Sequence, residues 1–115
     1  MGKWTEWKLI ADKYRYYTED FDYNEPSCYE LGIRKLKGGK VHPVYVGETV
    51  NERLRIHQYA ISGSHLTKII NWHLRNGWLL FYRGQAKKSK REAIKMQNRL
   101  LDKYDYDWNI QLNLD

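Results

Sequence analysis

Two tyrosines and one arginine have the residue types and the spacing for chemistry on a phosphate group. Tyr29 lies in the segment SCYELGIRKL, Tyr45 lies in VHPVYVG, and Arg55 follows ten residues after Tyr45. An arginine offers a fixed, permanently charged fork to a phosphate. A tyrosine hydroxyl can orient or activate water, although a pKa near 10 makes it a poor base unless a cation lowers that pKa. The alternative is that both tyrosines are strand aromatics that pack beside each other.

The composition is compatible with a nucleic-acid ligand. The chain has 115 residues, enough for one domain, with a net charge of +6 and 15% aromatic residues. Basic side chains neutralise phosphates, whereas a basic surface without such a ligand is the alternative. Cys28 is the single cysteine, which excludes an internal disulfide and a thiolate metal cluster. No apolar run approaches the roughly 18–20 residues of a membrane span, so we expect no membrane partner.

The elements that must position these side chains follow from hydrophobic periodicity and turn residues. We expect a helix over 5–17, strands over 27–36, 41–47 and 78–84, and helices over 49–61, 65–77 and within 86–109. This order predicts an α+β fold, a three-stranded, mainly antiparallel sheet flanked by helices, plus an N-terminal helix. Residues 1–25 are expected to be a helical extension, and 26–115 one compact domain.

Several residues predict where these elements begin and end. Thr49 with Glu52, and Ser89 with Glu92, have the spacing of a capping box at a helix start. Pro43 cannot donate a ladder hydrogen bond, so it is expected at an edge, a bulge or the start of a strand.

The helix that carries Arg55 offers neighbours on two faces. His57 lies about 200° round the helix from Arg55 and points away, whereas Tyr59, four residues on, shares its face. We therefore expect Tyr59 to belong to the site. Arg53 is expected to be a surface charge that can contact nucleic acid. The histidines at positions 42, 65 and 73 form no metal-binding spacing with one another.

These residues resemble the signature of the GIY-YIG nuclease family. Its two signature strands correspond to Ser27-Cys28-Tyr29 and Tyr45-Val46-Gly47, and Arg55 stands where the family carries its catalytic arginine. The segment EAIKMQNRLLDKYDYDWN (92–109) resembles the last helix of the family, with Asn109 in register at its end. The resemblance runs over residues 26–109.

The resemblance implies a metal-dependent endonuclease that hydrolyses phosphodiester bonds in double-stranded DNA. Tyr29, Tyr45, Arg55 and Tyr59 are then the candidate catalytic residues, with the tyrosines assisting water attack and the arginine stabilising the phosphate. The family uses one glutamate to hold one divalent metal, Mg²⁺ or Mn²⁺. A small stand-alone enzyme of phage or restriction type, in the cytoplasm of a bacterial or phage-infected cell, is the expected form.

Gln97 departs from the pattern, because it occupies the position of the metal-binding glutamate. An amide is a poor substitute for a carboxylate as a ligand of a hard cation. Glu92 cannot easily replace the carboxylate expected at position 97, because it lies about 140° away round the helix and has a capping role available. Two explanations are open. In the first, the natural protein itself carries glutamine and is inactive or unusual. In the second, which we favour, this sequence carries a substitution of glutamine for a natural glutamate at position 97. The competing function is a catalytically inactive nucleic-acid-binding protein on the same fold.

Candidate nucleic-acid contacts gather near the helix starts and around Arg55. They are Arg53, His57, His65, Lys68, Lys87, Lys88, Lys90, Arg91 and Asn109. The alternative for each run of basic residues is that it forms a solvent-exposed surface without a nucleic-acid ligand. A monomer with one site would nick DNA, whereas a homodimer could cut both strands. A further alternative is a scaffold that is not a nuclease and whose tyrosines are only structural.

Overall fold

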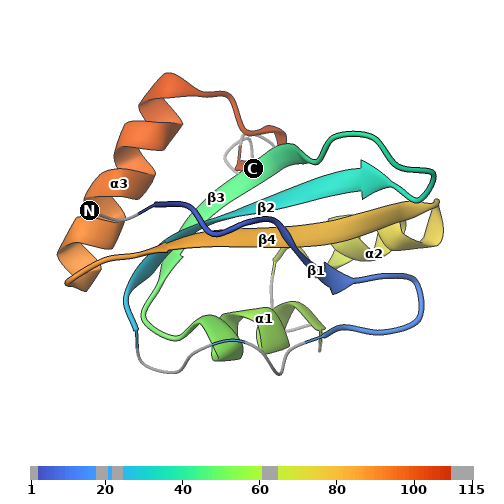
Figure 1. Ribbon diagram of the computed structural model, residues 1–115, viewed down its shortest axis with the longest axis horizontal. Coiled ribbons are helices and arrows are strands. Elements are labelled where there is room, and N and C mark those ends of the chain that lie inside the picture. The colour runs from blue at the N-terminus through green and yellow to red at the C-terminus, as the bar shows by residue number, and fades with distance from the viewer. Residues whose placement is uncertain (1–2, 18–20, 22–24, 61–64, 110–115) are drawn as a thin grey trace.

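The computed structural model describes residues 3–17, 21, 25–60 and 65–109. Within them, an antiparallel sheet has the strand order β1-β4-β2-β3. Helices α1 and α2 lie on one side of this sheet and α3 lies on the other (Figure 1). The bounds are β1 Lys8–Ala11, β2 Ser27–Lys35, β3 His42–Thr49, α1 Glu52–Ala60, α2 Thr67–Arg75, β4 Trp78–Ala86 and α3 Lys90–Lys103. The α+β fold is confirmed, with four strands in place of the expected three.

The expected N-terminal helix is wrong, because this segment supplies the fourth strand. β1 pairs antiparallel with β4, and Ile10 and Ala11 are fully buried there. After the strand the chain turns back, with the Asp12 carboxylate accepting hydrogen bonds from the backbone N–H groups of Tyr14 and Arg15. The apolar spacing fitted one face of a helix, but pairing with the edge of β4 buries Ile10 and Ala11 and completes that strand's ladder, while Tyr14 stays exposed. This pairing joins residues 8–11 to the sheet of the domain expected over 26–115.

The β2–β3 hairpin matches its sequence signals. Gly38 and Gly39 have φ values of 117° and 101°, which favour glycine, and they form the connection between the strands. Pro43 lies in the edge strand β3, opposite Gly32, where the register shifts. The missing N–H of the proline therefore interrupts no central ladder, as expected.

The helix starts agree with the sequence at α3 and differ at α1. The Ser89 hydroxyl accepts a hydrogen bond from the Glu92 N–H at 3.2 Å, which confirms that cap. At α1 the cap is Asn51, whose side-chain oxygen accepts from the Leu54 N–H at 3.0 Å. The expected capping box of Thr49 and Glu52 is wrong, because the Glu52 carboxylate accepts instead from the Tyr82 hydroxyl.

Two cores form on the two faces of the sheet. The face under α1 and α2 buries Tyr29, Leu31 and Tyr82 of the sheet. The face under α3 buries Cys28 and Val46. Successive strand residues point to opposite faces, so Tyr29 faces α1 while Glu30 faces the α3 side. No helix within the described ranges is long and apolar enough to cross a membrane.

Candidate functional site

The three predicted tyrosines come together on the α1 side of the sheet. Tyr29 of β2 and Tyr59 of α1 are almost completely buried, and their hydroxyl groups form a hydrogen bond with each other. The Tyr29 ring stacks on Tyr82 at 5.4 Å between centroids and lies 6.3 Å from the Tyr45 ring. Tyr45 keeps 9% of its surface exposed, so it is the member of the three that reaches solvent.

Gly47 makes room for this cluster. A Cβ atom at position 47 would lie 2.6 Å from the Tyr29 hydroxyl oxygen and 2.7 Å from the adjacent ring carbon. Tyr29 and Gly47 are cross-strand partners, so the tyrosine ring lies over the glycine. The glycine of the Tyr45-Val46-Gly47 segment therefore leaves the space that the Tyr29 ring occupies.

Arg55 lies half-buried on α1 and lines a pocket of about 140 Å³ at the start of that helix. The other lining residues come from the end of β3, the first turns of α1 and the start of α3; they are Glu48, Thr49, Val50, Asn51, Leu54, Gln58 and Lys90. Two cations, Arg55 and Lys90, thus border one small opening. Such a pair can hold a phosphate group.

The hydroxyl groups of the tyrosine cluster are held in their protonated form. Burial raises the pKa of Tyr29, Tyr45 and Tyr59 above the usual 10.0, and the nearby Arg55 charge lowers each pKa only in part. At neutral pH these groups donate hydrogen bonds, and they are poor proton acceptors. The arrangement suits orientation of water or phosphate better than removal of a proton.

Glu48 is a residue of this pocket that the sequence reasoning missed. It lines the same pocket as Arg55, and its Oε2 atom is buried without a hydrogen-bond partner among the described atoms. It pairs across the strands with Cys28, so it lies on the α3 side of β3. The available signal was its place next to Gly47, directly after the second signature strand.

Gln97 lies half-buried on α3, which packs against β2 and β3. Lys90, which lines the Arg55 pocket, is seven residues earlier, so the two side chains share one side of α3 about two turns apart. Gln97 itself does not line the pocket that contains Arg55.

A metal site in this region depends on few charged donors. The described residues contain no group of three or more His, Cys, Asp or Glu side chains placed to hold a metal ion. Gln97 brings no charge, and the Oε2 atom of Glu48, although it lacks a hydrogen-bond partner among the described atoms, is buried from solvent. A divalent cation in this region would depend on water and substrate oxygens for most of its coordination.

The predicted nucleic-acid contacts fall into two groups. Most are exposed, and the His65 ring lies 6.4 Å from the Tyr45 ring; the exposed residues are His57, His65, Lys68, Lys88, Lys90 and Arg91. Three others are tied into the fold. Arg53 donates to the Phe21 carbonyl at 2.8 Å, Lys87 donates to Gln85, and Asn109 exchanges hydrogen bonds with the backbone of Val46.

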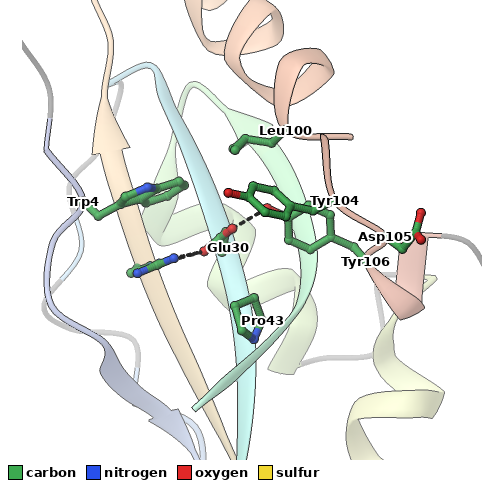
Figure 2. Close-up of a pocket in the computed structure, with 8 residues that line it drawn as sticks. Trp4, Glu30, Pro43, Leu100, Tyr104, Asp105 and Tyr106 are labelled. Carbon is green, nitrogen blue, oxygen red and sulfur yellow. Dashed lines mark hydrogen bonds and ion pairs between the residues drawn. The ribbon is translucent and has the colours of Figure 1, made fainter. Parts of the chain in front are cut away.

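A second pocket, of about 460 Å³, opens on the other face of the sheet and contains none of the predicted site residues. Figure 2 shows Glu30 at its centre, between Trp4 and the ring of Tyr104. The Glu30 carboxylate accepts from Arg83 at 2.6 Å and from the Tyr106 hydroxyl. Arg83 in turn packs against Trp4 and Trp7. This network is a structural anchor of the sheet.

The comparisons with known proteins agree with this geometry. The family profile described as "GIY-YIG domain-containing protein" matches residues 3–115. Protein EFFECTOR OF TRANSCRIPTION 2 of Arabidopsis thaliana is 30% identical over 112 residues, which cover 73% of this chain and 23% of the relative. The chain thus spans about a quarter of that protein's length. No solved structure matches the chain. With the profile matched over nearly its whole length, the chain belongs to the GIY-YIG family, as its tyrosines and Arg55 predicted.

Proposed function

We propose that this chain is a divalent-metal-dependent endonuclease that hydrolyses phosphodiester bonds in double-stranded DNA. The observation that carries the proposal is the gathering of Tyr45 and Arg55 beside the buried Tyr29–Tyr59 pair, with Arg55 lining an opening that Lys90 also borders. GIY-YIG domains are in general endonucleases, which supports the same reaction.

Each side chain has a role that its surroundings allow. Arg55 binds the scissile phosphate and stabilises the charge that develops on it. Tyr45, with its exposed edge, donates a hydrogen bond to the attacking water or to the phosphate. Tyr29 and Tyr59 are positioning residues, because their hydroxyl groups are buried against each other. When bound, a divalent cation would lower the pKa of a water molecule and neutralise developing negative charge.

Position 97 limits this activity. A glutamine there supplies an uncharged oxygen, so the expected activity of the chain as it stands is weak. Restoring the carboxylate with Gln97→Glu adds a charged oxygen on the side of α3 that also carries Lys90, a residue of the Arg55 pocket. We expect this near-isosteric change to increase cleavage.

We assign DNA binding to exposed basic residues at the starts of α2 and α3. Lys88, Lys90 and Arg91 lie at the start of α3, and His65 and Lys68 lie around the start of α2. Phosphate contacts of this kind fix position and carry no sequence preference directly. A monomer with one site would nick, whereas a homodimer would cut both strands. The phage or restriction type and the bacterial cytoplasm stay predictions, since the relative named above is a plant protein.

A second candidate function is DNA binding without catalysis. Gln97 favours it, because the family position for metal binding lacks its charge. The relative is named as an effector of transcription, and a DNA-binding role without cleavage is compatible with that name.

Two measurements on supercoiled plasmid DNA separate these functions. The first is an electrophoretic shift at rising salt, where loss of binding with salt indicates phosphate contacts. The second is nicking in Mg²⁺ or Mn²⁺ by the chain and by Gln97→Glu. Cleavage by Gln97→Glu supports the endonuclease, and binding without any cleavage supports the second function. If the chain does not bind DNA even at low salt, both proposals fail.

A further inference from the structure

We propose that Val50 and Leu54 bind the deoxyribose next to the phosphate held in the Arg55 pocket, and that they thereby favour DNA over RNA. The inference rests on the proposed function, because it concerns the nucleic acid that would occupy that pocket. Cations cannot make this choice, since the phosphates of DNA and RNA are alike and the two differ at the sugar hydroxyl.

The first step is the exposure of these two side chains. Val50 is 44% exposed and Leu54 is 50% exposed, and both line the pocket that contains Arg55. Single exposed apolar side chains are common on protein surfaces. Here two of them border one small opening together with two cations, so apolar surface and positive charge lie side by side. That combination fits a nucleotide, in which the carbon atoms of the sugar adjoin a phosphate.

The second step is the turn that carries them. The Thr49 hydroxyl accepts a hydrogen bond from the Asn51 N–H at 3.0 Å and donates to the Asn51 carbonyl at 3.1 Å. The Asn51 side-chain oxygen accepts from the Leu54 N–H at 3.0 Å. Val50 lies between the two bonded residues, and Leu54 lies in the first turn of α1. The backbone at both positions is therefore fixed before a ligand binds, which lowers the entropy cost of binding.

The third step is the charge of the pocket. Its lining has two cations, Arg55 and Lys90, against one carboxylate, Glu48, whose Oε2 atom is buried from solvent. The pocket therefore attracts a phosphate. The sugar bonded to that phosphate must lie close to it, where Val50 and Leu54 share the lining.

The fourth step is what a ribose would meet at the same place. A hydroxyl group against Val50 and Leu54 would lose its hydration without gaining a hydrogen bond from them. The Thr49 hydroxyl and the Asn51 side-chain oxygen are already bonded within the turn, and Gln58 offers the other side-chain amide of the lining. A deoxyribose carbon makes an apolar contact instead, which is favourable. The pocket should therefore bind DNA more tightly than RNA.

The experiment compares a DNA duplex and an RNA duplex of the same sequence, with binding followed by fluorescence anisotropy at several salt concentrations. The test variant combines Val50→Thr and Leu54→Gln, which nearly keep the side-chain sizes and add polar atoms. Leu36→Gln is the matched control, because Leu36 is also exposed but lines a different pocket. Circular dichroism checks that the fold persists, as expected for changes at exposed positions.

We expect the test variant to bind DNA about tenfold more weakly and to lose most of the preference for DNA over RNA. Its salt dependence should stay unchanged, because apolar contacts release no counterions. Lys90→Gln should do the opposite, lowering the salt slope by about one and leaving the preference in place. The Leu36→Gln control should bind both duplexes as the unaltered chain does.

Two results overturn the inference and leave the proposed function standing. One is equal binding of DNA and RNA by the unaltered chain, since the ribose hydroxyl then finds a partner. The other is a preference for DNA that the test variant keeps in full, since the selectivity then comes from the shape of the duplex. Absence of DNA binding by the unaltered chain at low salt instead refutes the proposed function, and the inference with it.

Discussion

Replacing Gly47 with alanine tests whether the second signature strand fixes the tyrosine cluster. The new Cβ atom would lie 2.6 Å from the Tyr29 hydroxyl oxygen, about 1 Å closer than the roughly 3.5 Å at which such atoms pack. Tyr29 cannot turn away at no cost, because it is fully buried, stacked on Tyr82 and hydrogen-bonded to Tyr59. The strand or the ring must shift within a packed core.

Overpacking of this kind costs about 1–3 kcal/mol, so we expect Gly47→Ala to lower the free energy of unfolding by that amount. Urea denaturation followed by tryptophan fluorescence measures the loss, as a lower midpoint at unchanged slope. If the protein cleaves DNA, cleavage should fall as well, because Tyr45 and Tyr29 lie on the strands that are forced apart.

A double-mutant cycle with Tyr29→Phe separates the clash from other effects of the alanine. Tyr29→Phe alone should destabilise the fold, since it leaves the buried Tyr59 hydroxyl without its partner. It also removes the nearest atom and the hydrogen bond that holds the ring in place, so the ring can shift away from the new Cβ although its carbon at 2.7 Å remains. The double variant should therefore lose about 1 kcal/mol less than the two single losses combined. Additive losses, or a Gly47→Ala protein as stable as the unaltered chain, would refute the reasoning.

Three other predictions concern the anchor, the tyrosines and the arginine. Glu30→Ala should cost about 3 kcal/mol in urea denaturation, because it leaves the Arg83 guanidinium without its carboxylate; a loss below 1 kcal/mol would contradict the anchor. Burial raises the folded-state pKa of Tyr29, Tyr45 and Tyr59 above the unfolded value of 10.0, so their contribution to stability is complete below about pH 10 and is lost as the pH rises through the folded values. Urea midpoints that stay constant from neutral pH to well above pH 10 would count against this burial. Arg55→Lys in the Gln97→Glu background should slow cleavage about a hundredfold while plasmid binding persists, since a lysine lacks the planar fork; an unchanged rate would remove Arg55 from the site.

The sequence was sufficient where spacing translates directly into geometry. The ten-residue step from Tyr45 to Arg55 spans the end of a strand and the first turn of a helix, so it placed both side chains at one edge of the sheet. The four-residue step to Tyr59 kept that residue on the inner face of α1, where it contacts Tyr29. Ser89 and Pro43 also marked local structure that depends on neighbouring residues alone.

The sequence was insufficient where distant segments decide the outcome. The 5–17 segment has the periodicity of a helix, but residues 8–11 pair with the edge of β4 and form a strand. The sequence of the segment itself contains no sign of this distant partner. The predicted capping role of Glu52 is wrong for a similar reason. Its carboxylate accepts a hydrogen bond from Tyr82, which lies on a later strand. Glu48 could not be recognised as a pocket residue, since its place there depends on how β3, α1 and the start of α3 come together.

The most direct test of the central claim is the nicking rate of supercoiled plasmid by Gln97→Glu, compared with the unaltered chain, in Mg²⁺ and in a metal chelator. The account predicts faster metal-dependent nicking by Gln97→Glu, and none in the chelator. If Gln97→Glu binds the plasmid yet leaves it intact in both Mg²⁺ and Mn²⁺, the chain is not the endonuclease proposed above.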